Sequence, residues 1–159
     1  PLKKNKGHLY EGGIRVPWIA RWASQIQPGS ICSTPVISTD LFPTIIAAAG
    51  SEISEGGEDG ENLMPLLHQS GKLKRDAIYF HYPNYAFHKR NRLGAAIREG
   101  DHKLIRWYDN EELELYNLNE DLGEKQDLST AQPELAKRLN NKLSQWLERS
   151  QAKMPTRVQ

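Results

Sequence analysis

A lysine lies within a glycine-rich segment near the start of the sequence, KNKGHLYEGGIRVP at residues 4–17. Glycines allow a backbone to approach a ligand closely, and a lysine ammonium is a compact positive charge suited to an anionic oxygen. Lys6, with Gly12 and Gly13 on the same segment, predicts an anion site in which Lys6 stabilises charge developing on the oxygens of a transferring group. The alternative is a solvated basic segment, because Lys3 and Lys4 lie just before Lys6.

Histidines and aromatic residues mark the other places where recognition is expected. His8 lies on the lysine segment, where its imidazole either helps to bind the anion or only decorates the turn. The segment YFHYPNYAFHKR, residues 79–90, offers rings that stack on sugar faces and polar groups that bind hydroxyls. We expect His81, Tyr82 and Asn84 to contact a substrate, since loops at strand ends often carry recognition residues. The alternative is ordinary strand burial of the tyrosines beside an exposed basic loop.

Several charged residues are expected to have structural or surface roles. Glu11 and Arg15 should pair with each other or with the backbone, outside a helix. His102 and Lys103 fall in a predicted strand, and we expect them at the surface rather than in a binding site.

The sequence shows no motif for calcium or for a thiol-based metal site. The acidic segment NEDLGEKQDL lacks the sixth-position glycine and the closing glutamate of a calcium-binding hand. We therefore expect a solvated loop for Asp121, Glu124 and Asp127. Cys32 is the single cysteine, so it forms no internal disulfide, and we expect it to be a buried or partly buried thiol.

Composition narrows the classes of function. The chain has 159 residues, of which 38% are hydrophobic, enough to bury a core. The 21 basic and 20 acidic residues leave a net charge of +1, so no global field recruits nucleic acid or an anionic membrane. No stretch approaches the roughly 20 apolar residues of a membrane span. The chain begins at Pro1 without a charged-then-apolar leader, which indicates a mature product or a piece of a longer protein.

The first third of the chain predicts one strand and one helix. Residues 14–22 alternate in polarity as a strand does, and such a strand normally belongs to a larger sheet. The segment STDLFPTIIAAAG, which begins at Ser38, offers Ser38 or Thr39 as an N-cap and Gly50 as a stop, which predicts a helix. Residues 51–62 are rich in glycine and acidic residues and are expected to form a loop or linker.

The rest of the chain predicts a small sheet and one long helix. The expected strands are 77–82, 94–98, 102–108 and 112–118, the last three forming an antiparallel meander because the turns between them are polar. Pro133 opens a helix whose apolar face should lie on the sheet. That face consists of Leu135, Leu139, Leu143, Trp146 and Leu147. The fold class is therefore α+β.

Several segments together resemble the C-terminal part of the sulfatase family. KGHLYEGGIRVPWIARW, which begins at Lys6, is similar to a family signature of the form K-G-x-x-Y-E-G-G-I-R-x-P, and STDLFPTIIAAAG follows it. AAIREGDHKLI, ELELYNLNEDLGEKQDL and the end helix resemble the small C-terminal subdomain of that family. The resemblance implies the end of an α/β catalytic core at 1–50, a linker and loop at 51–76, the subdomain at 77–150 and a tail at 151–159.

The resemblance also implies a site. Lys6 matches the family lysine that contacts the sulfate, and His-Tyr-Pro segments in the family border the substrate cleft. Sulfatases use a formylglycine made in a C/S-x-P-x-R segment together with calcium, and both lie upstream of the lysine. Cys32 does not replace this nucleophile, because its proline comes one place too late and Val36 stands where the arginine belongs.

The function implied is that of a C-terminal fragment of a sulfatase that hydrolyses sulfate esters, expected to be those of sulfated carbohydrates or small molecules. Calcium and formylglycine would come from the parent enzyme, whose N-terminal part is the expected partner, and this fragment alone should be inactive with no cofactor bound. The family implies a periplasmic or secreted location. The alternatives are a phosphodiesterase or phosphonate hydrolase of the same superfamily, and a noncatalytic carbohydrate-binding module.

Overall fold

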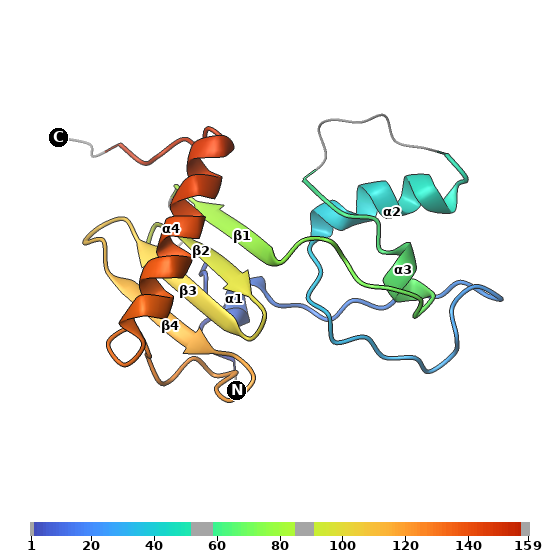
Figure 1. The fold of residues 1–159 in the computed structure, drawn as a ribbon, viewed down its shortest axis with the longest axis horizontal. Coiled ribbons are helices and arrows are strands. Elements are labelled where there is room, and N and C mark those ends of the chain that lie inside the picture. The colour runs from blue at the N-terminus through green and yellow to red at the C-terminus, as the bar shows by residue number, and fades with distance from the viewer. Residues whose placement is uncertain (1, 52–58, 85–90, 157–159) are drawn as a thin grey trace. The chain divides into compact units, whose positions relative to one another are not determined.

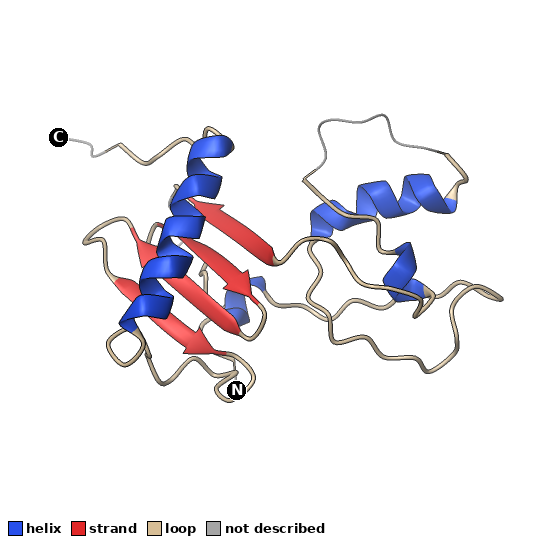
Figure 2. Ribbon diagram, viewed as in Figure 1, coloured by secondary structure: helices blue, strands red, loops and turns tan. Residues whose placement is uncertain are grey.

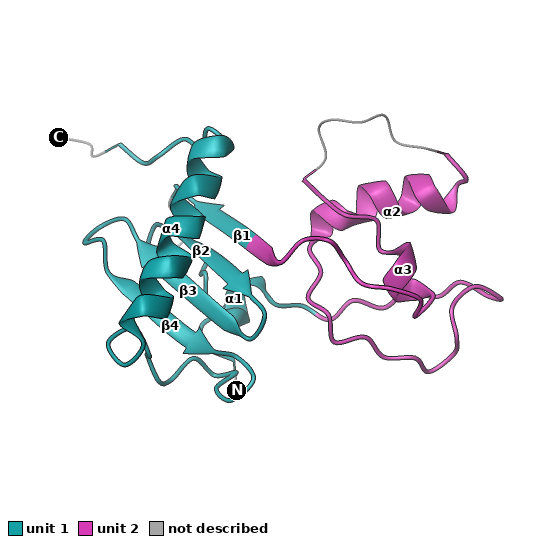
Figure 3. Cartoon of the chain, in the orientation of Figure 1, with its two compact units in different colours: residues 1–16, 79–159 teal, residues 17–78 magenta. Residues whose placement is uncertain are grey.

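The computed structural model describes residues 2–51, 59–84 and 91–156 (Figure 1). Helices and strands both occur, as the α+β prediction requires (Figure 2). The chain divides into two compact units (Figure 3). The first unit consists of residues 1–16 and 79–159, and the second of residues 17–78.

An antiparallel sheet of four strands, in the order β1-β2-β3-β4, forms the centre of the first unit. The strands are β1 (Ala77–Tyr82), β2 (Gly94–Glu99), β3 (His102–Trp107) and β4 (Leu113–Asn117). Ala96 of β2 lies opposite Ile105 of β3, and Leu104 of β3 lies opposite Leu115 of β4. Gly100, in the tight turn between β2 and β3, has a φ of 57°, which glycine adopts without strain. The predicted meander is confirmed.

One long helix, α4 (Pro133–Arg149), covers one face of this sheet and packs on β2, β3 and β4 (Figure 1). Proline occupies its first turn, where a missing N–H costs least. Its buried residues recur at helical spacing. They are Ala136, Leu139, Leu143 and Leu147. Polar and aromatic contacts fix the helix, because Arg106 of β3 donates to Ser144 Oγ at 2.7 Å and Tyr79 of β1 stacks on Trp146 at 4.8 Å.

The N-terminal segment covers the opposite face of the sheet. Side chains alternate between faces along a strand, so Ile105 and Trp107 point away from the face on which Arg106 meets α4. There they join a buried cluster with Leu9 and Tyr10. This segment ends in α1 (Glu11–Ile14), which lies behind the sheet in Figure 1. Both faces of the sheet are therefore buried, and the unit has three layers.

The second unit contains a short 3-10 turn and two helices. The elements are the turn Ser38–Asp40, α2 (Leu41–Ala48) and α3 (Met64–Leu67). The Asp40 carboxylate is fully buried and accepts hydrogen bonds from Arg75 Nη2 at 2.6 Å and from the Ile37 and Glu61 amides at 2.9 Å. Gly50, with a φ of 74°, follows α2 as the predicted stop. Residues 52–58 of the predicted loop lie outside the described residues.

The predicted strand at 14–22 is wrong. Ile14 ends α1, and residues 15–22 form neither helix nor strand, with Val16 79% exposed and Ile19 89% exposed. A strand needs a neighbour to receive its backbone hydrogen bonds, and no strand of the described residues pairs with this segment. Alternating polarity alone therefore does not make a strand here.

Candidate active site

The Lys6 loop folds back on α1 because two glycines allow it. The Gly12 amide donates to the Lys3 carbonyl at 3.0 Å, and a Cβ added to Gly12 would lie only 2.2 Å from the Lys4 carbonyl oxygen. A Cβ added to Gly13 would lie 2.1 Å from the His8 carbonyl oxygen. Contacts this short exclude any side chain at both positions. The two glycines thus allow residues 3–8 to lie against the helix, and Lys6, in the middle of these residues, is exposed.

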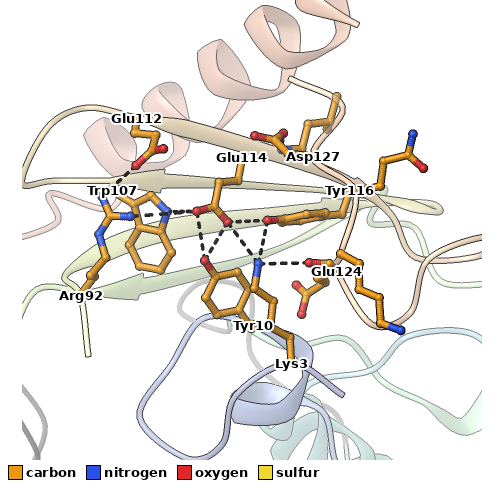
Figure 4. A network of polar contacts seen from close by, with 12 residues as sticks. Lys3, Tyr10, Arg92, Trp107, Glu112, Glu114, Tyr116, Glu124 and Asp127 are labelled. Atoms are coloured by element: carbon orange, nitrogen blue, oxygen red, sulfur yellow. Dashed lines mark hydrogen bonds and ion pairs between the residues drawn. The ribbon is translucent and has the colours of Figure 1, made fainter. Parts of the chain in front are cut away.

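Tyr10 fixes the loop to β4 through the largely buried carboxylate of Glu114 (Figure 4). Its hydroxyl donates to the two Glu114 carboxylate oxygens at 3.0 and 2.8 Å. The same carboxylate accepts from the Tyr116 hydroxyl at 2.6 Å and from Trp107 Nε1 at 2.9 Å. Burial, followed by the hydrogen bond to Glu114, raises the pKa of both tyrosines, so each hydroxyl stays protonated and continues to donate.

Glu11 fixes the loop to β3 through a buried lysine. The Lys103 ammonium has no exposed surface and lies 3.0 Å from Glu11 Oε1 and 2.8 Å from Glu124 Oε1. The second Glu124 oxygen accepts the Glu11 backbone amide at 2.7 Å. Burial raises the pKa of Glu124, and the nearby ammonium of Lys103 opposes this rise. Two carboxylates therefore share one cation beneath the loop.

Lys3 fixes the beginning of the same loop. Its ammonium donates to the Tyr116 hydroxyl and to the Glu124 carbonyl, both at 3.0 Å, and lies 4.0 Å from the centre of the Tyr10 ring (Figure 4). A cation over an aromatic face is attracted by the ring as well as by the hydrogen-bond acceptors. The loop is thus held on both sides of Lys6.

A pocket of about 320 Å³ lies between this loop and the edge strand β1. Its lining consists of Gly7, His8, Leu9, Gly13, Ile14 and Tyr79 to Tyr82. Three of the predicted substrate-binding residues, His8, His81 and Tyr82, are therefore brought together. Lys6 directly precedes the lining residue Gly7 and is exposed, whereas Asn84 is exposed and does not line the pocket. Residues 85–90 of the predicted recognition segment lie outside the described residues.

Contacts within the protein orient both histidine rings. His81 Nδ1 lies 2.7 Å from the Tyr108 hydroxyl, and its Nε2 lies 3.0 Å from the Lys153 carbonyl. His8 Nδ1 lies 3.0 Å from the Asn5 carbonyl. His81 thus presents a ring of fixed orientation to the pocket, held on one side by Tyr108, which directly follows β3, and on the other by the chain after α4.

Two surface predictions are wrong for a common reason. Lys103 and Glu124 are fully buried, although we expected a surface strand and a solvated loop. The common reason is that the N-terminal segment covers one face of the sheet, where Glu11 contacts both Lys103 and Glu124. Of the other two acidic residues in the predicted solvated loop, Asp127 is exposed and Asp121 is half-buried. Both brace the backbone, because Asp121 accepts the Lys125 amide at 2.6 Å and Asp127 accepts the Leu115 amide at 2.9 Å.

Three further expectations have mixed outcomes. Glu11 and Arg15 pair at 3.6 Å, as expected, but they lie four residues apart at the two ends of one helical turn rather than outside a helix. His102 is half-buried. The expectation of a buried or partly buried thiol at Cys32 is wrong, because Cys32 is exposed.

The described part of the chain contains no group of three or more histidine, cysteine or acidic side chains that could hold a metal ion. In the same residues no helix has the length and apolarity needed to cross a bilayer. Cys32 is not in a segment of the form C/S-x-P-x-R.

Sequence reasoning missed the buried partners that hold the loop. Side chains two residues apart on a strand point to the same face, so Lys103 shares a face with the buried Ile105, and Glu114 shares a face with the buried Tyr116. That alternation was the available signal, since a charged residue in an otherwise buried row needs a partner.

A lysine loop backed by paired glycines, lying on a small antiparallel sheet with a terminal helix, defines the C-terminal region of a sulfatase. The chain belongs to the family described as N-sulphoglucosamine sulphohydrolase, C-terminal, which matches residues 4–153.

Among curated relatives, a sulfatase of Formosa agariphila is 34% identical over 96% of this chain and 30% of its own length. An N-acetylglucosamine-6-O-sulfatase of Bacteroides thetaiotaomicron is 33% identical over 92% of this chain and 26% of its own. Among solved structures, Ps i-CgsB in complex with k-i-k-neocarrahexaose is 29% identical over 92% of this chain and 32% of that chain, with a TM-score of 0.75. This chain thus spans less than a third of each.

Proposed function

We propose that this chain supplies the sulfate-contacting lysine and part of the substrate cleft of a sulfatase that hydrolyses sulfate esters of carbohydrates. The observation that carries the proposal is the exposed Lys6 on a loop fixed at both ends, directly beside a pocket lined by His8, His81 and Tyr82. Membership of the sulfohydrolase family supports it.

Lys6 would act through its charge. Negative charge on the sulfate oxygens and on the leaving oxygen changes during ester cleavage, and a cation already in position stabilises the transition state without reorganising. Binding that is stronger in the transition state than in the ground state raises kcat. The glycine-backed loop provides this fixed position, because residues 3–8 have no room to shift toward α1.

The pocket would hold the sugar rather than the sulfate. Tyr82 would offer an aromatic ring and His8 a polar edge, while His81, both of whose ring nitrogens contact Tyr108 and Lys153, would offer the face of its ring. Such a lining suits a carbohydrate with apolar faces and hydroxyl rims. The relative named N-acetylglucosamine-6-O-sulfatase and the structure in complex with k-i-k-neocarrahexaose support a sulfated carbohydrate. We include Asn84 as a contact at the rim, next to the pocket-lining end of β1.

The nucleophile and the calcium site belong, on this proposal, to the rest of the parent enzyme. Formylglycine would supply the attacking hydroxyl and calcium would bind sulfate oxygens. The described residues hold no cluster suited to a metal ion, and Cys32 is not in a C/S-x-P-x-R segment. The 159-residue chain by itself should therefore not turn over a sulfate ester, because a lysine does not replace a nucleophile.

The test is Lys6→Ala in the full-length protein, with Lys125→Ala as the control. Lys125 is another exposed lysine of the same compact unit, and it does not line the pocket. We expect Lys6→Ala to lower kcat for an aryl sulfate and for glucosamine 6-sulfate by about 10²–10³, with a smaller change in KM. The control should stay within a factor of two. A Lys6→Ala enzyme within a factor of two of the parent contradicts the proposal, and faster turnover of an aryl phosphonate monoester than of the sulfates favours a phosphonate hydrolase.

A further inference from the structure

The buried charges beneath the loop are costly and have no role in the chemistry proposed above. Lys103, Glu11 and Glu124 are each at least 98% buried. Taking two carboxylates and an ammonium out of water costs several kcal/mol per ion before any attraction is gained, and apolar residues of the same size often stabilise a fold as well or better. Such a cluster is best explained by the single geometry it selects.

The geometry selected is that of the segment flanking Lys6. Glu11 is held twice, by its side chain on Lys103 at 3.0 Å and by its backbone amide on Glu124 at 2.7 Å. Lys3 is held by the Glu124 carbonyl at 3.0 Å. The two ends of residues 3–11 are therefore fixed to the same residue, and Lys103 binds the other carboxylate oxygen of that residue.

The neighbouring glycines transmit this position to the lysine. Glu11 begins α1, and Gly12 and Gly13 follow it in the same turn. Because the backbone of residues 3–8 touches these glycines at distances no side chain would allow, a shift of α1 must shift the loop. Arg15 and Arg98 lie 3.6 and 3.8 Å from the second carboxylate oxygen of Glu11, Oε2, which is buried, so they assist by their charge without making a direct hydrogen bond.

We propose that Lys103 is a positioning residue for the sulfatase reaction, which holds Glu11 and Glu124 together and thereby sets the place of Lys6. The inference rests on the proposed function of Lys6. Lys103 does not line the pocket, so it acts through the loop rather than on the substrate.

The first test is Lys103→Met in the full-length enzyme, which keeps the length of the side chain and removes the ammonium. We expect kcat for an aryl sulfate to fall by about 10- to 100-fold with KM within about threefold, since small displacements of a catalytic group cost rate more than binding. Glu11→Gln keeps an acceptor for Lys103 and should fall between the parent and Lys103→Met. If Lys103→Met does not fold, Glu11→Gln alone decides the matter, and a kcat within a factor of two then overturns the proposal.

A double-mutant cycle separates positioning from general damage. If Lys103 acts through Lys6, Lys103→Met should lower kcat by less than about threefold once Lys6 is already alanine. A further 10- to 100-fold fall in kcat in the Lys6→Ala background would show that Lys103 affects the rate independently of Lys6.

Leu143→Ala is the stability control, because Leu143 is fully buried in α4 on the other face of the sheet. We expect it to lower the thermal midpoint and to leave kcat at 25 °C within a factor of two, and an equal loss of kcat in both variants would overturn the proposal.

Hydrogen exchange gives a readout that does not depend on activity. In Lys103→Met, the amides of residues 9–14 should exchange at least about tenfold faster, while those of α4 keep their rates. Unchanged exchange of the loop refutes the anchoring role even if activity falls. If Lys6→Ala leaves activity intact but Lys103→Met releases the loop, the proposed function is wrong and the anchor stands.

Discussion

Glutamine in place of Glu114 should weaken the first unit far more than an isosteric change normally does. The Glu114 carboxylate is the common acceptor for Tyr10, Tyr116 and Trp107, at 2.6 to 2.9 Å for the shortest bond of each (Figure 4). It joins the N-terminal segment to β3 and β4, and only 12% of its side chain is exposed. Cations lie farther off, with Lys3 and Arg92 each 4.0 Å from one of its oxygens.

The magnitude follows from the charge on the acceptor. Hydrogen bonds to a charged group contribute about 1.5–3 kcal/mol each, and neutral ones about 1 kcal/mol. Glu114→Gln keeps one acceptor oxygen and makes every remaining bond neutral, so three bonds that each lose about 1 kcal/mol give about 3 kcal/mol in all. Tyr10→Phe removes one donor and leaves the other two in place, which should cost about 1.5 kcal/mol.

Native-state hydrogen exchange on the full-length protein measures these losses as the free energy of opening of the most protected amides in β3 and β4. Glu112→Gln is the matched control, because Glu112 pairs with Arg92 at 3.1 Å but is 49% exposed, and such a pair contributes under about 1 kcal/mol. The reasoning is refuted if Glu114→Gln costs no more than Glu112→Gln, or no more than Tyr10→Phe.

Two further predictions concern pH and the loop. Burial would raise the pKa of Asp40, but hydrogen bonds from Arg75 and from two backbone amides more than offset this and hold it below its ordinary value of 3.8. The unfolded chain takes up the Asp40 proton at a higher pH than the folded chain, so the second unit should lose stability as the pH falls below about 4. Asp40→Asn should therefore make the exchange of the α2 amides less dependent on pH in this range. Equal pH dependence in the parent and in Asp40→Asn would contradict the argument. Gly13→Ala should displace the loop, because the new Cβ would lie 2.1 Å from the His8 carbonyl oxygen. This displacement should lower kcat by about 10-fold or more. An unchanged kcat together with an unchanged loop would show that the loop does not need a glycine at this position.

The elements with local signals could be predicted from the sequence. The meander strands followed from polar turns around Gly100 and from short apolar runs, and α4 followed from the helical recurrence of its leucines after Pro133. These features depend on residues close together in the chain. The strand at 14–22 failed because its formation depends on a neighbour, which alternation within one segment does not reveal.

The candidate site divides in the same way. Lys6, His8, His81 and Tyr82 stand out by residue type, and the structure brings the last three to one pocket. Their supports did not stand out, because Lys103 lies 92 residues from Glu11 in the sequence and looks like an ordinary exposed strand lysine. Lys103 needs a buried partner only because both faces of the sheet are covered, and the sequence of its own strand does not reveal this.

The distance along the chain between the loop and its supports also affects the order of assembly during synthesis. Tyr10 and Glu114 are 104 residues apart, and the Glu11 amide and Glu124 are 113 apart. Ribosomes add about 5–20 residues per second, so the motif waits on the order of ten seconds for the residues that hold it. A protein truncated between β3 and residue 124 would carry the whole lysine motif in its sequence and lack Glu124, whose backbone carbonyl and carboxylate hold its two ends.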